Sequence, residues 1–200
     1  MTTLDQLARP PATDVKAFRQ HVEHHARELR RRAGIGLDEP FDPRLLTHEL
    51  KIRLADLDEI DGLSSEDRDL LSTIDARTWS GAGVPLPDGY TLVLLHPGQT
   101  RERATATIME EVCHSYFGHA PTRLVTLPGG IVKREYRLEV EREAYWTGAA
   151  ALLPSHIVAR AVWRGDGVEL ASIYGVSTEL VDFRIKILGL WWEHRKDLTN

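Results

Sequence analysis

Several features that mark particular protein classes are scarce in this chain of 200 residues. Its single cysteine, Cys113, excludes an intramolecular disulfide framework and any zinc finger built from four thiolates. No stretch approaches the roughly 18 uninterrupted apolar residues of a transmembrane helix. Residues 1–14 also lack the apolar segment of a signal peptide. We therefore expect no membrane association, and a reducing cytoplasm is the expected compartment because it suits a lone thiol.

The remaining composition is that of an ordinary soluble globular protein. Hydrophobic residues make up 42% and charged residues 28%, and the formal charge of -5 gives no footprint for nucleic acid. At roughly 150 residues per domain, this length predicts one domain. Pro10 and Pro11 lie in residues 1–13, which we interpret as a flexible leader, so the domain is expected over residues 14–200.

The spacing of apolar residues predicts an α+β fold in which a small sheet packs on helices. Asp14 is placed to cap the first helix. The apolar run at residues 90–96 predicts a strand that is covered on both faces. Helices are expected at about 14–33, 43–50, 100–118, 135–153, 155–163, 168–174 and 177–189, a helix or loop at 64–71, strands at 52–60, 74–83 and 90–96, and a hairpin at 125–132.

The helix expected at residues 100–118 carries the string E-E-x-x-H, beginning at Glu110. Glu110 and His114 are four residues apart, so they share one face of the helix and can offer two ligands to one metal ion. Glu111 is rotated by about 100° around the axis. From there its carboxylate can reach a water at the metal and act as a general base. The string is the H-E-x-x-H of zinc peptidases with its first histidine replaced by glutamate.

The next predicted helix, about 30 residues further on, completes a more specific pattern. It carries E-R-E-A at residues 141–144, followed by small residues and the sequence L-L-P at 152–154. This combination resembles the ImmA/IrrE family of metallo-endopeptidases over roughly residues 40–190, most clearly 90–154. The resemblance implies a zincin-like, gluzincin-type domain with an active-site helix and a mostly helical C-terminal part. It also implies a divalent metal cofactor and a protein or peptide substrate, often a transcriptional repressor.

The resemblance also assigns roles to individual residues. Glu111 matches the general base, His114 the second ligand of the active-site helix, and Glu141 the third ligand. Glu143 is the alternative third ligand if the register of the second helix differs by two residues. Glu110 departs from the family pattern, which has histidine at this position.

Glutamate at position 110 keeps a coordinating group but changes the chemistry of the site. Two carboxylates and one imidazole carry one more negative charge than the usual ligands, so a bound water would be acidified less. The harder ligands move the preference toward Mn²⁺ or Fe²⁺, although the general order of affinity still favours zinc. Zinc is therefore the expected ion, with manganese or iron as alternatives. A site that has lost its metal is the second interpretation.

Residues near this pair of helices complete the candidate site. Tyr136 or Tyr145 could assist the oxyanion, and nothing in the sequence selects between them. Tyr145 also stands where the family often has asparagine or aspartate. The resemblance places the strand at residues 90–96 at the edge of the sheet, where a zincin receives its substrate.

Most of the nine histidines are not candidate ligands. His119 lies about 140° around the helix from His114, and we interpret it as a histidine at the helix end. His21, His24 and His25 lie among arginines on the first predicted helix, which is typical of a solvated polar face.

Two further classes of function are compatible with the sequence. One is a non-catalytic regulatory module that binds a partner peptide along residues 90–96 by strand addition. The other is a DNA-binding regulator, because the last two predicted helices resemble a helix-turn-helix. Arg184 and Lys186 lie on the second of these helices, but Glu179 and Asp182 oppose them, so packing is the favoured role and nucleic acid is not an expected partner. The oligomeric state is left open.

Overall fold

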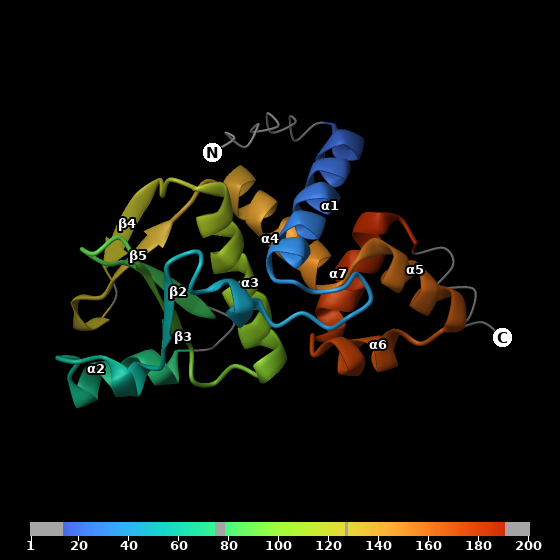
Figure 1. Ribbon diagram of the computed structural model, residues 1–200. Helices are drawn as coiled ribbons and strands as arrows, with labels where there is room; N and C mark the ends of the chain where they lie inside the picture. The colour runs from blue at the N-terminus through green and yellow to red at the C-terminus, as the bar shows by residue number, and fades with distance from the viewer. Residues whose placement is uncertain (1–13, 75–78, 127, 191–200) are drawn as a thin grey trace.

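The computed structural model describes residues 14–74, 79–126 and 128–190. The predicted leader, residues 1–13, and the end of the predicted domain, residues 191–200, lie outside these ranges. The predicted α+β class is confirmed: Figure 1 shows a small sheet and a hairpin beside three long helices, followed by a helical C-terminal part. Within the described ranges, no helix has both the length and the apolar character needed to cross a membrane.

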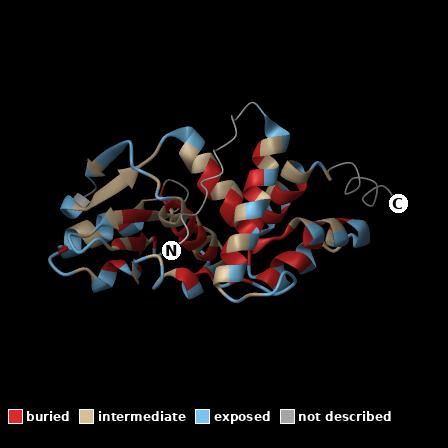
Figure 2. Ribbon diagram, turned by 45° about the horizontal axis from the view of Figure 1, so that its top comes forward, coloured by how far each residue is buried: buried red, intermediate tan, exposed pale blue. Residues whose placement is uncertain are grey.

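Three helices form the centre of the molecule: α1 (Val15–Arg32), α3 (Arg101–Phe117) and α4 (Leu138–Leu152). Asp14 caps α1 as predicted, because its carboxylate accepts a hydrogen bond from the Ala17 amide. The small residues of α4 allow it to pack closely against α3: a Cβ on Gly148 would lie 3.0 Å from the side chain of Met109. Figure 2 shows the buried residues gathered along these helices.

The main sheet has the strand order β1-β3-β2. Strand β3 (Thr91–Leu95) lies in the middle, parallel to β1 (Ile52–Ala55) and antiparallel to β2 (Gly81–Pro85). The expectation that residues 90–96 form the substrate-binding edge is therefore wrong, since both sides of β3 are already paired. The same pairing removes the strand-addition site proposed there for a partner peptide. Strand β2 is an edge of this sheet.

A hairpin separates the two helices of the candidate site. Strands β4 (Arg123–Thr126) and β5 (Val132–Glu135) pair antiparallel, so the hairpin is longer than predicted and α4 begins at Leu138 instead of residue 135. In Figure 2 its strands are exposed or only partly buried. Strand β5 runs close to β2. Side chains of the hairpin can therefore reach the edge of the main sheet.

The remaining elements frame this centre. The predicted helix at 43–50 is only a short 3-10 turn, and the predicted strand at 52–60 stops early because a second 3-10 turn follows it. Their bounds, with those of the other short elements, are η1 Pro43–Leu46, η2 Leu57–Glu59, α2 Ser65–Thr73, η3 Pro128–Gly130, α5 Ser155–Arg164, α6 Gly167–Tyr174 and α7 Thr178–Leu188.

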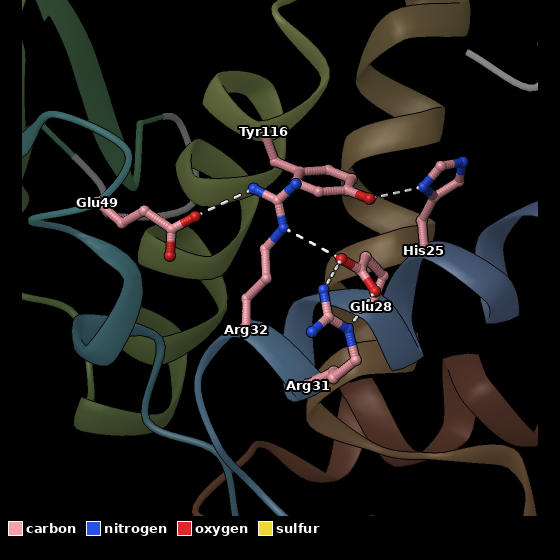
Figure 3. A network of polar contacts seen from close by, with 6 residues as sticks. All are labelled: His25, Glu28, Arg31, Arg32, Glu49 and Tyr116. Atoms are coloured by element: carbon pink, nitrogen blue, oxygen red, sulfur yellow. Dashed lines mark hydrogen bonds and ion pairs between the residues drawn. The ribbon is translucent and has the colours of Figure 1, made fainter. Parts of the chain in front are cut away.

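Polar contacts attach the end of α1 to its neighbours, as Figure 3 shows. The Tyr116 hydroxyl of α3 lies 2.8 Å from His25 Nδ1. The Arg32 guanidinium lies over the Tyr116 ring, 5.0 Å from its centroid, and reaches Glu49 at 3.1 Å. Glu28 pairs with Arg32 at 3.3 Å on the same helix. These contacts hold α1 beside the C-terminal end of α3, near the candidate site.

Candidate metal centre

Three side chains from α3 and α4 converge on one point. One ligand atom each from Glu110, His114 and Glu141 lie within 4.8 Å of one another. His114 Nε2 and Glu141 Oε2 are 3.4 Å apart. With metal–ligand bonds of about 2.0–2.1 Å, two ligands of a tetrahedral ion are about 3.3 Å apart. The His114–Glu141 pair therefore has the spacing that a divalent ion requires, and the helical spacing of Glu110 and His114 brings Glu110 to the same point, within reach of the same ion.

The electrostatics of this group also suit a cation. Burial, and then the negative charges of Glu141 and Glu111, raise the pKa of Glu110 to about 8 from its ordinary 4.5. The like charges disfavour an ionised Glu110, and a divalent cation among the carboxylates would favour it. A cation bound between these ligand atoms would thus offset the repulsion among the carboxylates.

Glu111 lies on the neighbouring face of α3, against the edge strand. Its Oε2 is 3.0 Å from Arg134 Nη2, on strand β5 of the hairpin. A Cβ added to Gly83 of β2 would lie 2.5 Å from that same Oε2 and 2.8 Å from Arg134 Nη2. The carboxylate of Glu111 thus occupies space that only a glycine on β2 leaves open.

Arg134 was not among the residues predicted from the sequence. It lies on a short polar strand, and only the tertiary position of the hairpin brings it to Glu111. The only feature of the sequence that could have pointed to Arg134 is that it is a basic residue in the segment between the two ligand helices.

The two candidate tyrosines have different surroundings. The Tyr136 ring stacks on the His114 ring, with centroids 3.9 Å apart and planes 13° apart. Its hydroxyl is buried and has no hydrogen-bond partner among the described residues, and burial raises the pKa of Tyr136 above its ordinary value. The Tyr145 ring packs on Phe183, 4.8 Å away. The structure therefore places Tyr136 directly on a candidate ligand and Tyr145 beside the C-terminal helices.

Glu143, the alternative ligand, does not join the convergent group. It is buried, and its two carboxylate oxygens lie 2.6 Å from His21 Nε2 and 3.3 Å from His119 Nε2. The interpretation of the histidines on the first helix as a solvated face is wrong for His21, which is buried. It is also wrong for His25, which is half-buried, whereas His24 is exposed.

A cavity of about 430 Å³ opens beside Glu110. Its walls include Arg103 and Thr107, which precede Glu110 on the same face of α3, and Tyr145 of α4. Leu180 of α7 closes another side. The cavity is large enough for a bulky side chain and lies next to the candidate metal position.

Comparison with known proteins gives one finding. Residues 70–186 match the model of a peptidase family that is described as the IrrE N-terminal-like domain. The match covers more than half of the chain and includes both ligand helices, whereas α1 precedes it. A search among curated proteins finds no match to the chain.

Proposed function

This chain belongs to the IrrE N-terminal-like family of peptidases, the ImmA/IrrE family, and on that premise we propose that it is a metal-dependent endopeptidase. The observation that carries the proposal is the convergence of Glu110, His114 and Glu141 beside a fourth polar group, Glu111. Metal-assisted hydrolysis needs three protein ligands for the ion and one separate general base, and this group of residues offers both.

In this proposal each side chain has one task. Glu110, His114 and Glu141 would hold the ion, with zinc as the expected metal. The bound ion would polarise the substrate carbonyl and lower the pKa of a water. Glu111 would accept a proton from the attacking water and would later deliver it to the leaving amine. The hydroxyl of Tyr136, which has no hydrogen-bond partner in the part of the chain that the structure describes, is the nearer candidate for donating to the oxyanion, because its ring lies on His114.

The substrate we propose is an extended segment of a protein. Strand β2 is an edge of the main sheet, and its Gly83 lies beside Glu111. A peptide that approaches the base from the side of the cavity beside Glu110 would place one of its side chains in that cavity. The family resemblance suggests a repressor-type protein as the target, and the lone thiol suggests the cytoplasm.

A second candidate is a peptidase fold without catalysis, and one contact favours it. Glu111 is held by Arg134 at 3.0 Å, so the base is already occupied by a cation. The DNA-binding alternative loses one of its two basic residues, since Arg184 is fully buried and cannot reach a phosphate. Its guanidinium donates to the carbonyl of Leu153 and pairs with Glu23.

Metal content and peptide cleavage together test the proposal. Protein purified without chelator is expected to hold one divalent ion per chain, which His114→Ala loses and Glu139→Gln, an exposed glutamate on α4, retains. A proteome-derived peptide library is then digested with the wild type and with Glu111→Gln, and new N-termini are counted by mass spectrometry. The wild type alone is expected to generate them. Bound metal with identical termini from both proteins would favour the non-catalytic candidate, and absence of metal would overturn the proposal.

A further inference from the structure

A continuous line of polar contacts runs through the interior from α1 to the candidate ligand His114. His21 Nε2 lies 2.6 Å from one oxygen of Glu143, and the other oxygen lies 3.3 Å from His119 Nε2. His119 Nδ1 in turn lies 3.0 Å from His114 Nδ1. His21, Glu143 and His114 are buried, and the His119 side chain is only 9% exposed. Groups so far from water need each other as hydrogen-bond partners.

The positions of the protons follow from the acceptor at Glu143. A carboxylate can only accept, so His119 must donate from Nε2 and His21 must donate from Nε2. A neutral His119 then has a lone pair on Nδ1. The proton in its contact with His114 must therefore come from His114 Nδ1, which leaves His114 Nε2 as a lone pair. That Nε2 is the atom that faces Glu141 and the candidate metal position.

The opposite assignment leaves contacts unsatisfied. If His114 carried its proton on Nε2, its Nδ1 could only accept, and His119 would have to donate from Nδ1. A neutral His119 would then turn a lone pair toward the Glu143 carboxylate, and two acceptors would face each other where the side chains are only 9% and 6% exposed. In the proposed assignment the acceptors that meet without a cation are His114 Nε2 and Glu141 Oε2, and the Glu141 side chain is 40% exposed, so water can hydrogen-bond to its carboxylate. A doubly protonated His119 would satisfy both contacts but would also place a proton on His114 Nε2, the atom needed as a ligand.

Aromatic contacts keep these rings from turning. Tyr136 stacks on His114 at 3.9 Å. The Phe117 ring is nearly parallel to both His119 and His21, with centroids 5.2 and 5.9 Å away and planes 16° apart in each case. The packing of these rings therefore holds each nitrogen atom in place as the donor or acceptor of its hydrogen bond.

We propose that His119 and Glu143 are positioning residues that hold His114 as the Nδ1–H tautomer, with His21 of α1 anchoring the Glu143 carboxylate. The inference rests on the proposed metal site. It extends that site to α1, which lies outside the family match. Outer partners of a ligating histidine fix its tautomer and raise its basicity, and their loss costs about 10–100-fold in metal affinity. Here the partner carboxylate acts through an interposed histidine.

The tautomer can be read in the metal-free protein, independently of metal binding. Full-length chain labelled with ¹⁵N-histidine and treated with chelator is measured by long-range ¹H–¹⁵N NMR at neutral pH, with variants assigning each ring. His114 is expected as Nδ1–H, and His119 and His21 as Nε2–H. A His114 ring with its proton on Nε2, or a doubly protonated His119, would overturn the proposal even if the protein binds metal. If the wild type binds no metal, the proposed function is rejected, but the same spectra still show whether His119 and Glu143 hold the His114 tautomer.

Matched variants separate positioning from stability. His119→Phe keeps a ring against Phe117 but removes the acceptor for His114, and Glu143→Leu removes the carboxylate. Each is expected to release the His114 tautomer and to weaken Zn²⁺ binding by about 10–100-fold in a chelator competition. Glu23→Gln is the control, because it weakens another tie between α1 and the body of the protein, the pair with Arg184. Unchanged Zn²⁺ affinity in both test variants, or an equal loss in the control, would contradict the proposal; if one variant fails to fold, the other decides.

Discussion

A methyl group at position 83 offers a sharp test of where Glu111 must lie. The Cβ of a Gly83→Ala variant would stand 2.5 Å from Glu111 Oε2, whereas ordinary contacts begin at 3.4 Å. The carboxylate must therefore move by about 0.9 Å. Because a displacement of about 1 Å in catalytic geometry can cost about 100-fold in rate, we expect kcat/KM to fall by about that factor, or about 2.7 kcal/mol.

Stability and metal binding should barely respond to this change. The atoms that the methyl meets are the ends of two flexible side chains, Glu111 and Arg134, and an alanine restricts the unfolded chain. We expect the free energy of unfolding to change by less than about 1 kcal/mol. Gly81→Ala is the contrasting control. Its Cβ would lie 3.0 Å from the backbone oxygen of Leu94, so it should lose about 1–3 kcal/mol of stability.

The assay compares peptide cleavage, Zn²⁺ affinity and urea unfolding for the two glycine variants. Normal Zn²⁺ binding together with wild-type cleavage by Gly83→Ala would refute this role of Glu111, since the position of its carboxylate would then be irrelevant. Faster cleavage would also refute it. In that case the contact between Glu111 and Arg134 would restrain the base, and the methyl would have released it.

Three further predictions concern charge. Glu110→His restores two imidazoles and one carboxylate, so the ratio of Zn²⁺ to Mn²⁺ affinity in competition titrations should rise; an unchanged ratio would contradict the role of Glu110 as a ligand. Burial, with His21 and His24, lowers the pKa of His25 from 6.5 to about 4, so only the unfolded chain gains this proton and stability should fall as the pH drops from 6.5 to 4. The full shift in pKa corresponds to about 3 kcal/mol, but because this site is half-exposed we expect a loss of about 1 kcal/mol in the free energy of unfolding. The His25→Gln variant should then show a flatter dependence of urea stability on pH than the wild type, and identical profiles would contradict the prediction. Glu23→Gln leaves a buried guanidinium without its counter-charge and should cost about 2 kcal/mol in urea unfolding, and a loss under about 0.5 kcal/mol would show that the pair contributes little.

The parts of the site that lie on regular helices were predictable from the sequence. A spacing of four residues places Glu110 and His114 on one face of any helix, and the apolar pattern around residues 100–118 was strong enough to predict that helix. The small residues after Glu141 carried part of the family resemblance, and in the structure they allow α4 to pack closely on α3. The spacing of residues along each helix was sufficient to predict these ligands, because the helical repeat defines the face on which each one lies.

Features that depend on tertiary pairing were missed. Residues 90–96 read as a covered strand, which is correct, but the sequence does not encode which strands lie on either side, and the parallel partner β1 makes β3 central. The interpretation of the first helix also failed for a physical reason. His21 stands among arginines in the sequence, yet its side of the helix turns to the buried Glu143, which lies 122 residues further along the chain. Arg134 reaches Glu111 only because the hairpin folds back beside β2.

The central claim is that one ion is held by Glu110, His114 and Glu141, and anomalous diffraction at the zinc edge tests it most directly. Crystals grown with Zn²⁺ are predicted to show one strong peak about 2.0–2.2 Å from His114 Nε2 and from an oxygen of each glutamate. A map without a peak at this position, or with a peak bound by Glu143 in place of Glu141, would contradict the account.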